Sequence, residues 1–349
     1  MKSESEIKTK IAITMGDPAG IGAEVCVKAL AQARTYEACI PIVIGDRSAI
    51  EDAISFCHLP LEIREIDNPE DAQGRFGQID LISLDLLAPG SWKYKQNSAL
   101  GGHVSYEYIT RAINLAKDKK VAAVVTAPIS KESLHLAGFP YSGHTEIFAE
   151  QTGTRDYAML LASRNIHVIH VSTHVSLREA CDRVKKDRVL KVIRLADIGM
   201  RQLGYENARI AVAGLNPHCS ENGLFGNEEV NEIIPAIEEA KSDGLNVIGP
   251  ESPDVVFVKC CAGQYDIVVA MYHDQGHIPL KLNGFQYNFH QNRYTSVNGI
   301  NCTIGLPIIR TSVDHGTAFG KAGEGRANEE SMLDAISAAV KMAHYKQMH

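Results

Sequence analysis

The sequence predicts an α/β protein built on parallel sheets that helices cover on both faces. Short apolar runs alternate along the whole chain with segments of helical periodicity, and this alternation is typical of that class. The expected strands are apolar almost throughout, as parallel strands buried on both faces usually are. Neither an internal repeat nor a low-complexity linker interrupts the pattern, so any domain boundary is crossed by compact connections.

The expected elements follow one another in strand–helix order. The strands share a run of apolar, often β-branched residues that ends in Gly, Pro or polar residues, at 10–17, 40–46, 121–130, 165–176, 208–218 and 265–273. The helices share apolar residues spaced three and four apart, at 23–33, 105–120, 177–184, 188–205, 227–244 and 330–346. The Gly-rich stretch 18–22 joins the first strand to the first helix, and Gly244 is a typical helix end.

Composition limits the class of protein. The chain has 349 residues, 45% of them hydrophobic and 22% charged, which indicates a soluble globular protein of one large or two moderate domains. No run approaches the roughly 20 apolar residues of a membrane span, and the polar N-terminus lacks a signal-peptide core. The eight cysteines form no CxxC pair, which favours reduced thiols in the cytoplasm. A net charge of −7 without a basic block argues against a nucleic-acid partner.

Polar residues gather just after the expected strands. They occur in TMGDPAG, TAPIS, STHVS, GLNPHCSENG and MYHDQGH. In open α/β sheets the carboxyl ends of the strands are where ligands bind. The pattern therefore indicates a small-molecule site rather than a flat interaction surface.

Three histidines follow expected strands within a few residues: His174, His218 and His273. Because the carboxyl ends of parallel strands lie at one edge of a sheet, we expect the three imidazoles to converge there. Three neutral imidazoles with open positions for a substrate suit Zn²⁺ or another first-row divalent ion. Their spacing is too long for a zinc finger, and each can equally be a hydrogen-bonded loop residue.

Asp274 and Lys281 follow the third of these histidines. Asp274 can orient an imidazole or relay a proton. Lys281, which we expect to be positioned by a turn around Pro279, can bind a phosphate or act as an acid or base. In isolation, a lysine at this position can also simply solvate the surface.

Two further stretches suit anions. SGHTEIFAEQT, from Ser142, has the pattern of a loop that opens a helix, with Thr145 as N-cap and His144 beside it, where free backbone N–H groups can receive an anion. Arg310 follows an apolar run and suits a carboxylate or phosphate. A plain helix cap and a salt bridge explain these two features equally well.

The glycines of MGDPAGIGAE match neither a dinucleotide nor a Walker fingerprint, and close packing accounts for them. No nucleophile elbow is present.

Taken in order, seven stretches closely resemble the 4-hydroxythreonine-4-phosphate dehydrogenase family, from Ile11 nearly to the C-terminus: ITMGDPAGIGAE, TAPISKESLHLAG, GHTE, STHVSLR, GLNPHCSENGLFGNEE, AMYHDQGHIPLK and GLPIIRTSVDHGTAF. The resemblance implies an NAD-dependent, metal-requiring homodimer that is distantly related to isocitrate and isopropylmalate dehydrogenases. It implies two α/β/α domains with the active site in the cleft between them. We place the first domain at 1–135 together with 305–349 and the second at 136–304.

The resemblance also assigns residues. His174, His218 and His273 match metal ligands that the family shares between two subunits, for Zn, Mg, Mn or Co. The matching substrate contacts are His144, Thr145, Lys281, Asn301 and Arg310, and acidic positions near the metal match Asp254 and Asp274. Segment 315–328 resembles the stretch that lies against the dinucleotide in the isopropylmalate relatives, which implies cofactor contacts by His315, Gly316, Thr317 and Asn328. Those relatives carry an acid where this chain has Gly320, which leaves the choice between NAD and NADP open.

Several motifs are more similar to a sister branch that oxidises D-threonate 4-phosphate and D-erythronate 4-phosphate. The stretch between Lys281 and Asn301 is also longer than in the vitamin-B6 enzymes. The implied reaction oxidises the C3 hydroxyl and releases CO₂, giving dihydroxyacetone phosphate, with Asp274 as the candidate for proton transfer and Lys281 as the alternate. The alternative substrate is 4-hydroxy-L-threonine 4-phosphate, giving 3-amino-2-oxopropyl phosphate. More remote alternatives are a metal-dependent phosphatase or aldolase, and a non-catalytic sensor of phosphorylated acids.

Overall fold

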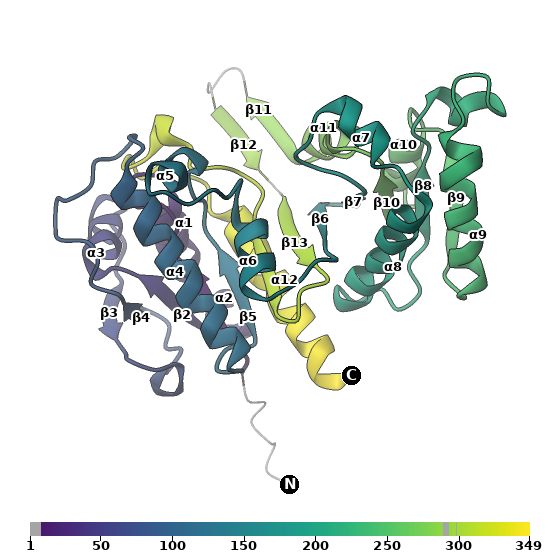
Figure 1. Cartoon of the computed structure of the whole chain (residues 1–349). Coiled ribbons are helices and arrows are strands. Elements are labelled where there is room, and N and C mark those ends of the chain that lie inside the picture. The colour runs from purple at the N-terminus through teal and green to yellow at the C-terminus, as the bar shows by residue number, and fades with distance from the viewer. Residues whose placement is uncertain (1–7, 289–292, 298) are drawn as a thin grey trace, which may run out of the picture. The chain divides into compact units, whose positions relative to one another are not determined.

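A computed structural model describes residues 8–288, 293–297 and 299–349. The chain forms two compact units (Figure 1). Unit 1 comprises Met1–Thr154 and Leu306–His349, and unit 2 comprises Arg155–Gly305. The first crossing therefore follows Thr154, beyond the expected boundary at residue 135. Within the described ranges, no helix has both the length and the apolar character that crossing a membrane takes.

Unit 1 contains a parallel sheet in the order β3–β4–β2–β1–β5–β14. Its strands are β1 Lys10–Thr14, β2 Ile40–Gly45, β3 Glu62–Glu65, β4 Gln78–Ser83, β5 Ala123–Thr126 and β14 Ile309–Val313. The last strand returns from the C-terminal part of the chain and pairs with β5, which brings Arg310 beside Val124 in the register.

Some helices of unit 1 pack directly on this sheet and others pack on neighbouring helices. The helices of unit 1 are α1 Gly22–Leu30, α2 Ala33–Ala38, α3 Arg47–Phe56, α4 Ala99–Lys117, α5 Lys131–Leu136, α6 His144–Gln151 and α12 Glu330–Met348, with short 3₁₀ helices η1 Pro69–Asp71 and η4 Phe319–Lys321. Helix α4 packs on β1, β2 and β5, and α12 packs on β14 and β5. The hydroxyl of Thr311 on β14 donates to the carbonyl of Ala335 on α12 at 2.8 Å.

Unit 2 contains a mixed sheet in the order β13–β6–β7–β10–β8–β9. Its strands are β6 Ala158–Ser163, β7 Ile166–His170, β8 Ile210–Ala213, β9 Val247–Glu251, β10 Ile267–Ala270 and β13 Ile300–Ile304. β7, β10, β8 and β9 are parallel neighbours, whereas β6 is antiparallel to both β7 and β13. The expectation of a parallel sheet therefore holds for β7, β10, β8 and β9 and is wrong at β6. Only Arg164 and Asn165 separate β6 from β7, and so short a connection can join only antiparallel strands.

Strands β11 Phe285–Asn288 and β12 Arg293–Val297 form a separate antiparallel pair. This pair falls in the stretch between Lys281 and Asn301. Residues 289–292 and 298 of the same stretch lie outside the described residues.

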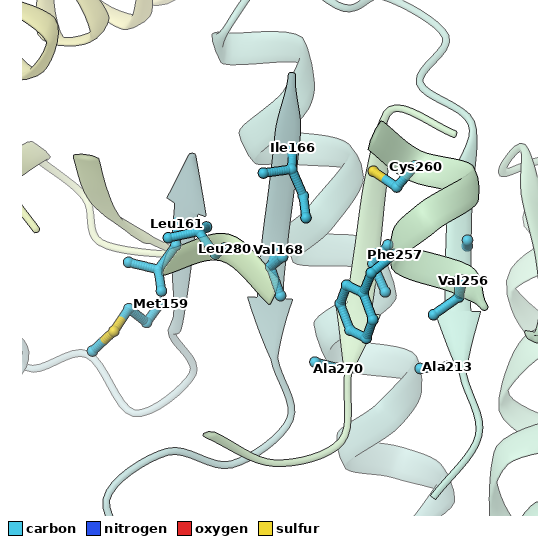
Figure 2. Close-up of a cluster of buried hydrophobic side chains, with 12 residues drawn as sticks. Met159, Leu161, Ile166, Val168, Ala213, Val256, Phe257, Cys260, Ala270 and Leu280 are labelled. Atoms are coloured by element: carbon cyan, nitrogen blue, oxygen red, sulfur yellow. The ribbon is translucent and has the colours of Figure 1, made fainter. Parts of the chain in front are cut away.

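Helices lie on both faces of the unit 2 sheet. They are α7 Leu177–Asp182, α8 Lys186–Gln202, α9 Ile234–Ser242, α10 Val256–Cys261 and α11 His273–Gly284, with the 3₁₀ helix η2 Pro217–Glu221 and the π-helix η3 Glu229–Ile233. Gly199 lets α8 approach one face, because a Cβ there would lie 2.8 Å from Cδ1 of Leu160. Leu161, the next residue of β6, faces the other side and joins a buried cluster with Phe257 of α10 and Leu280 of α11 (Figure 2). This alternation is that of a strand buried on both faces.

Each strand and helix expected from the sequence is present, with bounds shifted by a few residues, so those predictions are confirmed. The expected turn around Pro279 is wrong, because Pro279 lies inside helix α11 and Lys281 lies in its last turn. Proline inside a helix removes one backbone hydrogen bond. Burial of His277 and Leu280, with the packing of α11 on β7 and β6, outweighs that local preference.

Replacing Leu161 by Ala should lower the free energy of unfolding by about 2–5 kcal/mol, because the fully buried side chain would leave a cavity between β6 and α11. The measurement is urea denaturation followed by circular dichroism. Ile198→Ala is the matched control in the same unit, since Ile198 is 44% exposed. Equal losses in the two variants would contradict the placement of this core.

Candidate active site

Two of the predicted metal ligands lie together at the carboxyl ends of β7 and β10. The ring centroids of His174, four residues after β7, and His273, at the start of α11, are 5.9 Å apart. Nδ1 of His273 lies 2.7 Å from Oδ1 of Asp274. A carboxylate on one ring nitrogen orients an imidazole and leaves Nε2 for a ligand. These three residues have the chemistry of a partial metal site.

Two further histidines, which the sequence did not single out, lie next to His273 and form a ring cluster with it. The ring of His277 lies 3.7 Å from that of His273 and 4.7 Å from that of His170, centroid to centroid. Nδ1 of His277 is 3.1 Å from the carbonyl oxygen of His273 and therefore carries a proton. Burial lowers the pKa of His277 to about 4 and that of His170 to about 3, so both rings are neutral near pH 7. His273 and His277 are four residues apart, which places them on one face of a helix. The sequence would have indicated their contact only if helix α11 had been predicted.

The third predicted ligand, His218, lies on a loop of unusual conformation. Residues 218–222 all have positive φ, including His218 (51°), Cys219 (55°) and Ser220 (63°). Such backbone is costly for residues other than Gly and persists where surrounding contacts impose it, often at functional sites. The loop start is held by Glu229, only 1% exposed, whose Oε1 accepts from the N–H groups of Leu215 (2.8 Å) and Asn216 (2.7 Å).

Asp254, an acidic position that the sequence also marked, is influenced by the charge of His218. Ser252, which donates to Oδ1 of Asp254 at 2.5 Å, is the main cause that holds the pKa of that carboxyl below its usual value, and a backbone hydrogen bond and the charge of His218 act in the same direction. Among the residues that the structure describes, no group of three or more His, Cys, Asp and Glu side chains is arranged to hold a metal ion. The convergence of His174, His218 and His273 around one ion therefore stays a prediction. His218 itself sits five residues past the end of β8, within the left-handed run.

Gln275 ties the two histidine-bearing loops together inside unit 2. Its Oε1 accepts from the N–H of Met271 (2.7 Å), and its Nε2 donates to the carbonyl of Gly214 (2.8 Å). The side chain is 9% exposed. It therefore links the end of β10 to the end of β8.

Unit 1 holds the predicted anion contacts. Arg310, 2% exposed, donates from Nη2 to Oγ1 of Thr126 at 2.9 Å and lies 5.7 Å from the ring of Phe148. Burial, with the nearby positive charge of Arg310, holds the pKa of His144 well below its usual value. Nε2 of this neutral His144 is buried and has no hydrogen-bond partner, so it can meet a ligand atom. The expected cap at Thr145 is wrong, because α6 begins at His144 after Gly143, without a side-chain cap.

The predicted cofactor residues lie on the connection between β14 and α12 in unit 1. The carbonyl of Thr317 accepts from the N–H of Ile21 at 3.1 Å, and a Cβ on Gly20 would lie 3.0 Å from Cβ of Thr317. The glycine therefore permits this close approach. Nδ1 of His315 lies 3.1 Å from the carbonyl oxygen of the exposed Gly316, while its Nε2 is buried without a hydrogen-bond partner. Oδ1 of Asn328 accepts from the N–H of Glu330 at the start of α12.

The two remaining predicted contacts lie in unit 2. Lys281 is exposed, with Nζ 5.8 Å from the ring centroid of Phe285. Asn301 lies on β13, and its Oδ1 is buried without a hydrogen-bond partner. An acceptor in that state is available to a ligand donor.

Replacing Gln275 by Glu should lower the free energy of unfolding by roughly 1–3 kcal/mol, since a buried carboxylate oxygen would then face the carbonyl of Gly214. Amide hydrogen exchange should rise in residues 214–222. Gln264→Glu, at an exposed position of the same unit, is the control. Unchanged exchange in Gln275→Glu would show that the amide does not link the loops.

The low pKa of His144 predicts a loss of stability in acid. Above about pH 6.5, the ordinary histidine pKa, both folded and unfolded chains carry the neutral ring. Below it, only the unfolded chain takes up the proton, so the free energy of unfolding falls as the pH drops. His144→Gln should flatten this slope in denaturation experiments at a series of pH values. His135→Gln, at an exposed position, controls for loss of an imidazole, and an identical slope in His144→Gln would contradict the assignment.

Comparison with known proteins supports the motif assignment. The chain matches the family described as "Pyridoxal phosphate biosynthetic protein PdxA" over residues 37–339. It is 47% identical over 339 residues to the D-threonate 4-phosphate dehydrogenase of Salmonella typhimurium, which covers 97% of this chain and 100% of the relative. The crystal structure of a 4-hydroxythreonine-4-phosphate dehydrogenase from Klebsiella pneumoniae aligns with a TM-score of 0.83 at 45% identity, covering 98% of this chain and 99% of that one.

A more distant structure bears on the fold alone. A β-decarboxylating dehydrogenase from Thermococcus kodakarensis aligns with a TM-score of 0.51 at 13% identity, over 94% of this chain and 82% of its own. Together with the Klebsiella structure it confirms the predicted α/β fold class. The family inferred from the sequence motifs is also confirmed, and the chain belongs to the PdxA family of pyridoxal phosphate biosynthetic proteins.

Proposed function

We propose that this chain catalyses the NAD-dependent, divalent-metal-dependent oxidation and decarboxylation of a 4-phosphorylated 3-hydroxy acid. The favoured substrate is D-threonate 4-phosphate or D-erythronate 4-phosphate, which gives dihydroxyacetone phosphate and CO₂. The observation that carries the proposal is the near full-length similarity to proteins named D-threonate 4-phosphate dehydrogenase. The enzyme would work in the cytoplasm.

The residues of unit 1 suit the negative groups of such a substrate. Arg310 offers a buried guanidinium, and His144 offers an unpaired ring nitrogen near it. A guanidinium with a neutral hydrogen-bonding neighbour is well suited to a carboxylate or phosphate. Thr145 of the same helix, and Lys281 and Asn301 of unit 2, are the further substrate contacts in this proposal.

The partial site at His174 and His273 supports a metal site completed by a second copy of the chain. Catalytic zinc sites use three protein ligands as a rule, and imidazole nitrogen is a common ligand of Zn. One chain brings together His174 and His273, with Asp274 hydrogen-bonded to His273, while His218 lies on the left-handed loop after β8. In a homodimer, His218 of the partner subunit would supply the third imidazole.

A divalent ion held there would lower the pKa of the substrate alcohol and later polarise the ketone. The chain itself must orient the acid and move a proton. In the proposal Asp274 accepts the proton of the C3 hydroxyl, with Lys281 as the alternate. General acid–base help of this kind is typically worth about 10²–10⁴-fold in rate. The hydride would pass to NAD bound along segment 315–328, through His315, Gly316, Thr317 and Asn328.

A second substrate has its own support. The matched family is described by pyridoxal phosphate biosynthesis, and the aligned Klebsiella structure is named for 4-hydroxythreonine 4-phosphate. That substrate carries an amine at C2 where D-threonate 4-phosphate carries a hydroxyl. The curated relatives with 46–47% identity over nearly the whole chain make the hydroxyl form the favoured one.

The test is NADH formation, followed by absorbance, with D-threonate 4-phosphate, D-erythronate 4-phosphate and 4-hydroxy-L-threonine 4-phosphate side by side. We expect turnover with the first two, its loss after treatment with a chelator and its return with Zn²⁺, Mn²⁺ or Co²⁺. Turnover with 4-hydroxy-L-threonine 4-phosphate and with neither of the other two compounds would make it the assigned substrate. Phosphate release or carbon–carbon cleavage without NADH would contradict the dehydrogenase.

A further inference from the structure

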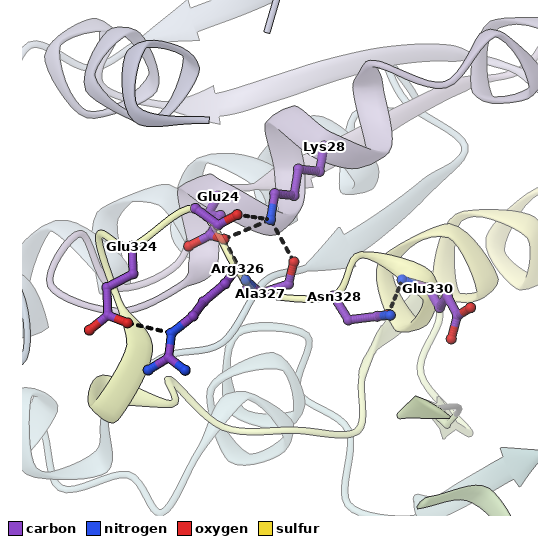
Figure 3. A network of polar contacts seen from close by, with 8 residues as sticks. Glu24, Lys28, Glu324, Arg326, Ala327, Asn328 and Glu330 are labelled. Atoms are coloured by element: carbon purple, nitrogen blue, oxygen red, sulfur yellow. Dashed lines mark hydrogen bonds and ion pairs between the residues drawn. The ribbon is translucent and has the colours of Figure 1, made fainter. Parts of the chain in front are cut away.

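Glu24 and Lys28 of helix α1 form an ion pair that hydrogen-bonds to the backbone of segment 325–327 (Figure 3). Nζ of Lys28 donates to Oε1 of Glu24 (2.8 Å) and to the carbonyl oxygens of Gly325 (2.8 Å) and Ala327 (2.7 Å). Oε1 of Glu24 also accepts from the N–H of Ala327 at 2.5 Å. Three backbone groups of the segment are thus held by two side chains that lie one helical turn apart.

Burial distinguishes this pair from an ordinary surface salt bridge. The Glu24 side chain is 1% exposed and that of Lys28 is 16% exposed, whereas the pair Arg47–Glu51 on α3, with the same spacing, is 46% and 53% exposed. A lysine ammonium has three protons to donate, and Lys28 uses all of them on Glu24 and the segment. The pair therefore fixes the position of the backbone at 325–327, whereas an exposed pair would mainly interact with water.

The longer segment 315–328, of which 325–327 is one end, is also held near its other end, at Thr317. The N–H of Ile21 donates to the carbonyl of Thr317, and Gly20 lets the two backbones approach. In addition, Glu324 forms ion pairs with Lys95 and Arg326. The backbone between Thr317 and Ala327 thus runs between two fixed points, one at Ile21 just before α1 and one at Glu24 and Lys28 on α1. The proposed function assigns the dinucleotide to segment 315–328, which contains this stretch.

We propose that Glu24 and Lys28 are positioning residues for the dinucleotide: they hold segment 315–328 in its binding conformation before the cofactor arrives. This inference rests on the proposed function. A segment that is already ordered loses little conformational freedom on binding, whereas a loosened one must be ordered by the ligand and binds it more weakly. Loss of the pair therefore weakens dinucleotide binding and leaves the phosphorylated acid, which meets other residues, unaffected.

The test compares NAD binding to Lys28→Met, Lys28→Arg and Glu24→Gln with binding to the wild-type protein, by equilibrium dialysis. We expect Kd for NAD to rise roughly tenfold in Lys28→Met, equivalent to about 1.4 kcal/mol, and less in Lys28→Arg, which keeps the charge. Hydrogen exchange of the amides at 325–327 should rise in the same order. KM for NAD should rise while kcat and the Kd of D-threonate 4-phosphate stay within about twofold. If Lys28→Met does not fold, Lys28→Arg and Glu24→Gln, which keep the site polar and filled, carry the comparison.

Glu51→Gln is the matched control, because it breaks an exposed pair of the same spacing in the same unit and should leave Kd for NAD unchanged. A merely structural pair would lower the melting temperature of the Lys28 and Glu24 variants with no change in Kd for NAD, and that result overturns the inference alone. Failure of the wild-type protein to bind NAD would instead overturn the proposed function, and this inference with it.

Discussion

The structure depends on buried polar side chains that satisfy the backbone of loops outside the sheets. Such loops have N–H and C=O groups without strand or helix partners, and leaving them unpaired in the interior is costly. Glu229 satisfies the start of the His218 loop, Gln275 links the ends of β8 and β10, and Glu24 with Lys28 holds the segment before α12. Each of these side chains lies next to residues with proposed chemistry, so the same contacts that fold the loops also place the candidate site.

The predictable part of the fold was its hydrophobic periodicity. Apolar runs such as those of β1, β5 and β10 are buried on both faces, and burial of that kind leaves a plain pattern in the sequence. Two features of the fold could not be predicted from the sequence, each for a physical reason. The antiparallel direction of β6 follows from the two-residue connection at Arg164, which carries no apolar pattern. Helix α11 contains Gly276 and Pro279, both unfavourable to helices, and forms because its buried face packs on β7 and β6.

The candidate site was predictable as a set of residue types but not as an arrangement. His174, His218 and His273 were marked by their positions after strands and by the family motifs. The stacking of His273 on His277 depends on an unforeseen helix, and the start of the loop that carries His218 is held by hydrogen bonds to Glu229. Sequence spacing contains neither, because both are set by tertiary contacts. Within the described residues one chain pairs His174 with His273, and the proposed metal site therefore takes its third imidazole from a second copy.

Mixing two inactive variants tests that shared site most directly. His218→Ala and His273→Ala chains would each be inactive alone, because every site would lack one imidazole. When the two chains are co-expressed, a mixed dimer contains one site with His174 and His273 from one chain and His218 from the other. The account predicts that metal-dependent NADH formation reappears in the mixed dimers. A mixed preparation that forms dimers yet stays inactive would contradict it.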